Sequence, residues 1–156
     1  CREPGNLEAR AHMQKASFNA GLSFRRIGTG YIHAIAHRLG EFCHIPHGLA
    51  IASVFTAVLK AYMPYSADKC AKLAMSAGVG ENELSDIENA NLFFEAVDKL
   101  ISDIGIASDV KAISLREEDI DDIVRRVQDE AKLIGYPRPF SDCQLADLIR
   151  KTFFAI

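Results

Sequence analysis

The chain has 156 residues, of which 49% are hydrophobic and 25% are charged, and its formal net charge at pH 7 is −3. This length suits one domain with a sizeable core, and we expect residues 1–156 to form a single helical domain. No block of basic residues stands out, which argues against nucleic acid and acidic membranes as partners. The sequence shows no signal peptide and no apolar run of about 18 residues. We therefore expect a cytoplasmic protein that does not span a membrane.

The four cysteines form no metal-binding or redox motif of the C-x-x-C kind. They are Cys1, Cys43, Cys70 and Cys143. Cysteines scattered in this way through a chain of this size are typical of reduced, intracellular proteins. Cys43 lies within a histidine-rich stretch, where it is either a metal ligand or a small apolar filler. Burial as a filler is the favoured interpretation.

Hydrophobic residues recur at helical spacing along nearly the whole chain, and no strand alternation is present. This pattern predicts an all-α bundle of about seven helices with no sheet. The expected helices span residues 7–22, 31–39, 46–61, 66–77, 89–104, 118–134 and 142–154. Gly40 and Pro64 are predicted to end the second and third of these helices. A capping box of Ser114 with Glu117, and a cap at Ser141, are predicted to begin the last two.

The glycines before the second expected helix do not form a nucleotide-binding loop. Gly28-Thr29-Gly30 lacks the third glycine of the dinucleotide-binding motif, and no strand precedes it. We therefore expect no nucleotide-binding domain within this chain.

Four of the five histidines fall within fifteen residues: His33, His37, His44 and His47. Imidazole is the commonest nitrogen ligand of transition metals and titrates near neutral pH. His33 and His37 are four positions apart, so on a helix they share a face, although such a pair alone is more typical of a polar surface. His47 follows a proline at the start of the next helix. A tight glycine turn between the two helices would bring His47 back toward His33.

The other candidate ligands are weaker. His44 is expected to cap a helix or face solvent, His12 to be a surface or partly buried residue of the first helix, and Glu41 to belong to the turn. Two or three histidines do not complete a usual metal site, and a carboxylate or a further histidine should join them. The sequence identifies no such residue. A helical scaffold whose histidines are satisfied by hydrogen bonds is the alternative.

Two segments of the chain resemble the signature of the iron-containing (group III metal-dependent) alcohol dehydrogenases. They are residues 30–40 (GYIHAIAHRLG) and residues 46–50 (PHGLA). Residues 8–17 (EARAHMQKAS), residues 136–139 (YPRP) and the last helix resemble the same family on either side of the signature. The resemblance covers essentially all of this chain but only the C-terminal helical domain of the family's two-domain architecture.

The resemblance implies a role for three of the histidines. The family binds its metal through an aspartate and three histidines, and His33 and His47 match the two later histidine ligands. His37 matches the histidine that stands between the metal site and the nicotinamide, so it is the expected catalytic and cofactor-contacting residue. In the family the aspartate, the first histidine ligand and the dinucleotide-binding domain lie upstream of the segment matched here. The implied cofactors are Fe²⁺ or Zn²⁺ at an incomplete site, and NAD or NADP only together with the missing N-terminal domain.

Two functions follow as hypotheses. In the first, the chain is the metal- and substrate-binding half of an NAD(P)-dependent alcohol dehydrogenase for a small alcohol or aldehyde, inactive as an isolated chain. In the second, it is a stand-alone helical module derived from such an enzyme, which binds metal or oligomerises without dehydrogenase activity. Because the missing domain should leave apolar surface uncovered around Gly28 to Gly48, we also expect a homo-oligomer.

Overall fold

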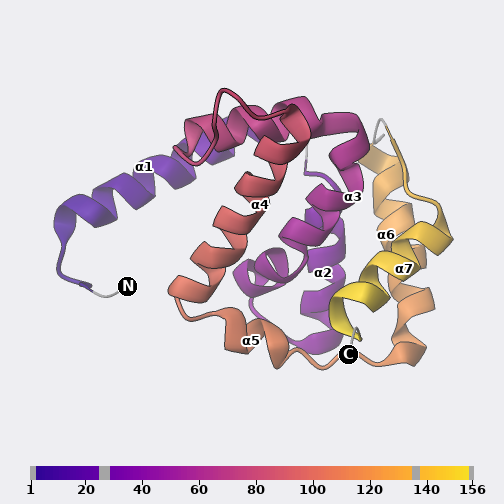
Figure 1. Cartoon of the computed structure of the whole chain (residues 1–156). Coiled ribbons are helices and arrows are strands. Elements are labelled where there is room, and N and C mark those ends of the chain that lie inside the picture. The colour runs from indigo at the N-terminus through magenta and orange to yellow at the C-terminus, as the bar shows by residue number, and fades with distance from the viewer. Residues whose placement is uncertain (1–2, 25–28, 135–137, 155–156) are drawn as a thin grey trace.

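The computed structural model describes residues 3–24, 29–134 and 138–154. Within these ranges it contains seven α-helices, one short 3₁₀ turn and no strand, so the all-α prediction is confirmed (Figure 1). Cys1, Gly28, Tyr136 and Pro137 lie outside the described residues. The elements are α1 (Leu7–Phe24), α2 (Tyr31–Cys43), α3 (His47–Ser76), α4 (Asp86–Asp103), α5 (Ala107–Lys111), η1 (Glu117–Asp119), α6 (Ile120–Ile134) and α7 (Asp142–Phe153).

The main hydrophobic core lies where α2, α3, α6 and α7 meet. Its largest fully buried side chains include Ile35 and Leu39 from α2, Ile123 from α6, and Leu145 and Ile149 from α7. These residues recur at intervals of three or four, which gives each helix one apolar face directed at the core. The face of α2 that carries them is therefore held between α3 and α6.

The long helix α3 joins two segments that the sequence predicted to be separate helices. Pro64 lies inside α3, and the backbone leaves helical geometry at Ser66 (φ −146°, ψ 18°). Proline removes one helical hydrogen bond and clashes with the preceding turn, so it kinks the helix. The Ser66 hydroxyl donates to the Tyr62 carbonyl at 3.0 Å and satisfies an acceptor within the distorted turn. The predicted break is thus a kink.

Serine caps fix the starts of α4 and α7. Ser85 forms a reciprocal capping box with Glu88, and Ser141 forms one with Gln144. The predicted cap at Ser141 is confirmed, whereas the predicted capping box at Ser114 is wrong. There the chain forms the 3₁₀ turn η1 without a side-chain cap, and α6 begins only at Ile120.

Helix α1 differs from the other long helices because it is exposed along its length. Every residue from 7 to 23 except Gly21 is exposed, and Figure 1 shows the N-terminal part of α1 extending away from the other helices. Its large apolar side chains at the surface are Leu7, Met13, Phe18 and Leu22. The sequence placed the uncovered apolar surface around Gly28 to Gly48. That placement is wrong for residues 29–48, since none of the exposed large apolar side chains lies there.

Among the described residues, α3 is the one helix that is long and apolar enough to cross a membrane, judged by length and composition only. The expectation that no segment reaches this length and composition is therefore wrong for α3. A single such helix is weak support for a membrane span, because the central helix of a soluble bundle passes the same test. Here α3 packs against α2, α4, α5 and α7.

Candidate metal centre

A three-residue turn connects α2 to α3 and reverses the direction of the chain. Gly40 was predicted to end α2, but it lies inside this helix, which continues to Cys43. His44 then adopts the left-handed conformation (φ 54°, ψ 38°) and serves as the C-cap, a position at which glycine is more usual. Pro46 precedes the first helical residue of α3, and its carbonyl accepts from Ala50 at 3.0 Å. The turn is therefore built around His44 and Pro46, whereas its sequence had predicted a glycine turn.

The start of α2 is anchored by a buried hydrogen-bond network. The Tyr31 hydroxyl donates to Oε1 of Gln128 at 2.9 Å, and it accepts from the backbone N–H of Phe140 at 3.1 Å. Gln128 in turn donates to the Phe140 carbonyl at 2.7 Å. These bonds tie the first turn of α2 to α6 and to the segment before α7. His33, two residues after Tyr31, is consequently carried on a fixed part of the helix.

Three imidazole rings converge, two from α2 and one from the start of α3. The ring centroids of His33 and His47 are 5.5 Å apart, those of His37 and His47 are 5.3 Å apart, and those of His33 and His37 are 6.3 Å apart. His33 and His37 project from one face of α2, and His47 is the first residue of α3. The sequence spacing therefore does bring these three side chains together.

The ring planes distinguish His37 from the other two histidines. His37 stacks on His47 with an interplanar angle of 24°, so these rings present faces to each other. His33 and His47 are tilted by 51°. Two imidazoles bound to one tetrahedral ion place their ring centres roughly 5 Å apart. The His33–His47 pair fits that separation, and His37 lies alongside the pair.

The environment of His33 favours its neutral form. Burial lowers the pKa of His33, the neighbouring His47 and His37 rings lower it further, and Glu130 acts in the opposite direction. Neutral imidazole is the form that binds a metal. His33 is partly buried, whereas His37 and His47 are exposed. The cluster is consequently open to solvent on the side of His37 and His47.

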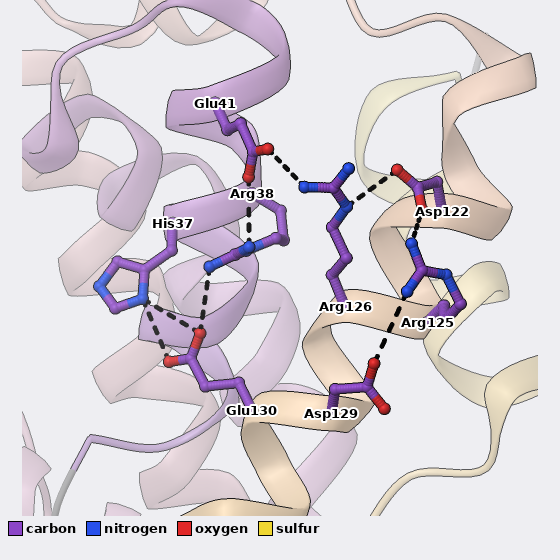
Figure 2. Close-up of polar contacts among 8 residues, drawn as sticks. All are labelled: His37, Arg38, Glu41, Asp122, Arg125, Arg126, Asp129 and Glu130. Carbon is purple, nitrogen blue, oxygen red and sulfur yellow. Dashed lines mark hydrogen bonds and ion pairs between the residues drawn. The ribbon is translucent and has the colours of Figure 1, made fainter.

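The cluster has a polar partner that its sequence did not reveal, Glu130 on α6. Nδ1 of His37 lies 3.1 Å from Oε1 and 3.3 Å from Oε2 of Glu130. Arg38 donates to Oε2 of the same carboxylate at 3.4 Å. Figure 2 shows this arrangement, with Glu41 on the other side of Arg38. Glu130 is 93 positions from His37 and one of many acidic residues, so no local sequence signal identifies it.

The remaining candidate ligands take other roles. His44 is exposed and caps α2, and His12 is exposed on α1, as expected for both. Cys43 is partly buried against the main core, and burial raises the pKa of its thiol, so it behaves as an apolar filler. Glu41 lies in the last turn of α2, where it pairs with Arg38 at 3.2 Å and with Arg126 at 2.5 Å.

The donor set fits part of a metal site. Across residues 3–24, 29–134 and 138–154, no group of three or more His, Cys, Asp or Glu side chains is placed to hold a metal ion. Nevertheless, His33 and His47 supply two imidazoles whose ring centroids, 5.5 Å apart, suit binding to one ion. A usual site of four protein ligands, or of three with an open position, needs donors beyond these two.

A small apolar cavity adjoins His33. Its volume is about 260 Å³, and it lies between the first turn of α2 and one face of α3. Ile51, Phe55 and Tyr62 line it from α3. The tilted ring of Tyr62 also packs against Phe140 at 4.8 Å, which links this wall to the network that anchors α2.

Comparison with known proteins agrees with the helical arrangement. The 1,3-propanediol dehydrogenase of Citrobacter freundii is 30% identical over 148 residues, which are 95% of this chain and 38% of that enzyme. The lactaldehyde reductase of Escherichia coli (strain K12) is 30% identical over 145 residues, 93% of this chain and 37% of that enzyme. A crystal structure of a 1,3-propanediol oxidoreductase matches with a TM-score of 0.86 at 30% identity, over 96% of this chain and 39% of that chain.

The region matched is the C-terminal one. The family model described as "Fe-containing alcohol dehydrogenase family, C-terminal" covers residues 1–153. The chain spans under two fifths of the length of the relatives named above. It belongs to the Fe-containing alcohol dehydrogenase family, and it corresponds to the C-terminal portion of those enzymes.

Proposed function

We propose that this chain forms the metal- and alcohol-binding half of an NAD(P)-dependent alcohol dehydrogenase. In this proposal His33 and His47 bind the metal, and His37 lies beside the substrate and the nicotinamide. The observation that carries it is the convergence of these three rings, with centroids 5.3–6.3 Å apart, in a chain of this family. The substrate would be a small alcohol or aldehyde, by analogy with relatives named for 1,3-propanediol and lactaldehyde.

In the proposed reaction the metal and the nicotinamide supply the chemistry, and the residues of the chain bind and orient the reacting groups. A bound Fe²⁺ or Zn²⁺ would act as a Lewis acid on the alcohol oxygen, and NAD or NADP would supply the hydride chemistry. His33 and His47 would hold the metal from two consecutive helices. His37, held by Glu130, would orient the substrate through the ring nitrogen that Glu130 does not occupy. The exposure of His37 and His47 means that further protein must cover them to exclude water.

Two imidazoles alone hold a metal weakly, because each missing donor removes both binding energy and geometry. We therefore expect the 156-residue chain to bind Zn²⁺ weakly and to contain less than one metal per chain as purified. Titration with Zn²⁺, followed by histidine NMR, should shift the resonances of His33 and His47. His33→Ala should abolish these shifts. His12→Ala, which removes an exposed histidine on α1, is the matched control and should preserve them.

The activity test uses the same chain. We expect no alcohol-dependent formation of NADH or NADPH by the isolated chain, measured by absorbance. Dehydrogenase activity of the chain alone would contradict this expectation. Metal bound at one ion per chain and lost in His33→Ala would contradict the expected weak binding, because it would mean that another residue completes the site.

A stand-alone helical module is the second candidate function. The observation that favours it is the lack, within the described residues, of a third metal ligand beside His33 and His47. The exposed apolar side chains of α1 would then serve self-association into a homo-oligomer. Light scattering at rising protein concentration tests this alternative, and a clean monomer throughout would rule out the oligomer.

A cytoplasmic location remains part of the proposal. The three described cysteines, Cys43, Cys70 and Cys143, are all free. Free cysteines are typical of the reducing interior of the cell. Quantifying free thiols under denaturing conditions, in protein purified without reductant, tests this point, since the proposal expects every cysteine to react.

A further inference from the structure

Glu130 joins the histidine cluster to α6, the helix that packs against α2. It projects from α6 toward α2 and has a side chain that is 20% exposed. Both of its carboxylate oxygens lie within hydrogen-bond distance of Nδ1 of His37, at 3.1 and 3.3 Å. Glu130 therefore contacts His37 on the edge of the imidazole that carries Nδ1.

A second contact holds the carboxylate in place. Arg38, the neighbour of His37, donates to Oε2 of Glu130 at 3.4 Å. Arg38 also donates to Glu41 at 3.2 Å, and Glu41 pairs with Arg126 of α6. In Figure 2 these side chains form a continuous row of alternating charges between α2 and α6. Glu130 sits at the end of this row, where it reaches His37.

The direction of the hydrogen bond follows from the chemistry of the carboxylate. An ionised carboxylate can only accept hydrogen bonds, so Nδ1 of His37 must be the donor. In neutral imidazole one ring nitrogen carries the hydrogen and the other keeps a lone pair. The tautomer with hydrogen on Nδ1 therefore leaves Nε2 as the acceptor. Figure 2 shows that second nitrogen on the side of the ring away from Glu130.

We propose that Glu130 is a positioning residue of this site, which fixes His37 in its Nδ1–H tautomer and holds the ring against His47 with Nε2 free to accept a hydrogen bond. This inference rests on the proposed function, in which His37 faces the substrate. A carboxylate that orients a functional imidazole by accepting from its other nitrogen is a recurrent arrangement in catalytic and metal sites. The Arg38 guanidinium, which donates to Oε2 of Glu130, keeps the Glu130 carboxylate at the required place.

The tautomer of His37 can be read directly by long-range ¹H–¹⁵N NMR of the ¹⁵N-labelled chain, recorded under conditions in which the His37 signals are those of a neutral ring. A His37→Gln variant assigns the signals. We expect the Nδ1–H form to exceed the Nε2–H form by roughly tenfold, as a charge-assisted hydrogen bond implies. In Glu130→Ala the Nε2–H form, which free imidazole favours in water, should become the major one.

Glu41→Ala is the matched control because it removes a carboxylate from the same row of charges without touching His37. Its His37 tautomer should equal that of the wild type. Glu130→Gln keeps the size of the side chain but can donate as well as accept, so the preference should fall there too. Circular dichroism of each variant reports whether the helices remain folded.

A predominant Nε2–H form in the wild type would overturn the proposal, and so would an unchanged tautomer in both Glu130 variants. If Glu130→Ala does not fold, the wild-type spectrum and Glu130→Gln decide. The measurement needs no metal and no nicotinamide. Its failure would therefore leave the proposed dehydrogenase function standing. A Zn²⁺ titration that leaves the His33 and His47 resonances unshifted would count against that function and would leave the tautomer result intact.

Discussion

Helices α1 and α2 follow one another in the sequence but have opposite environments. Helix α2 buries five of its thirteen residues, and four of these have no exposed surface: Ala34, Ile35, Ala36 and Leu39. Helix α1 has eighteen residues and buries none of those whose side chains are described. Yet α1 also carries large apolar side chains, including Phe18 and Leu22. Apolar content alone therefore does not decide which helix enters the core.

The difference lies in how the apolar residues are arranged around each helix. In α2 they concentrate on one face, which α3 and α6 cover. In α1 they lie on two opposite sides of the axis, with Leu7, Phe18 and Leu22 on one side and Met13 on the other, so no single face defines where the helix should pack. A helix that is apolar on more than one side is suited to packing against other protein on each of those sides. Its stability in this chain then depends on its own backbone hydrogen bonds and its cap.

The strongest test of this comparison removes a side chain from the core face of α2. Ile35→Ala should lower the free energy of unfolding by about 2–5 kcal/mol, because it deletes a fully buried side chain and leaves a cavity. Urea unfolding followed by circular dichroism measures the loss. A loss below about 1 kcal/mol would mean that the α2–α3–α6 core is loosely packed.

A smaller, local effect is expected at the start of α1. The Asn6 side chain accepts from the backbone N–H of Ala9 at 3.0 Å, which makes it the cap of this helix. Asn6→Ala should destabilise α1 by about 1 kcal/mol. Amide hydrogen exchange should show faster exchange in α1 and unchanged exchange in α2. Asn6→Asp, which keeps an accepting oxygen, should restore the protection. Slower folding or a lower melting temperature of the whole chain would indicate that α1 is coupled to the core.

The smallest effect is expected on the exposed surface of α1. Phe18 is 67% exposed, so Phe18→Ala should change the free energy of unfolding by less than about 0.5 kcal/mol. The measurement is the same urea unfolding as for Ile35→Ala, at a protein concentration low enough to prevent association. A loss comparable to that of Ile35→Ala would show that α1 packs against the body or against a second copy in solution.

Much of the fold followed from local patterns. The all-α class and the positions of the long helices follow from helical spacing, and the cap at Ser141 follows from residue type. The errors also have local causes. Pro64 kinks α3 instead of ending it, because the rest of the long apolar helix is held by α2, α4 and α7. The five-residue helix α5 was not predicted, since one turn carries too little periodicity to detect.

The candidate site, like the fold, has one part that local sequence predicts and one part that depends on tertiary packing. The spacing of His33, His37 and His47 was sufficient to predict that their rings meet, because they lie on two consecutive helices. The contact of His37 with Glu130 depends on how α6 packs against α2, and it joins residues 93 positions apart. Such long-range pairs have no signature in a single sequence. The functional roles of all four residues stay predictions until the metal and tautomer measurements are made.

The number of residues between His33 and His47 decides whether their imidazole rings meet. Each residue added to a helix rotates everything that follows it by about 100° and advances it by about 1.5 Å. Inserting or deleting a single residue of α2 between His37 and Cys43 would therefore swing the imidazole of His47 away from that of His33, even with every histidine still present. The interval of fourteen positions between these two histidines, which includes the short connection from α2 to α3, therefore sets the separation of their rings.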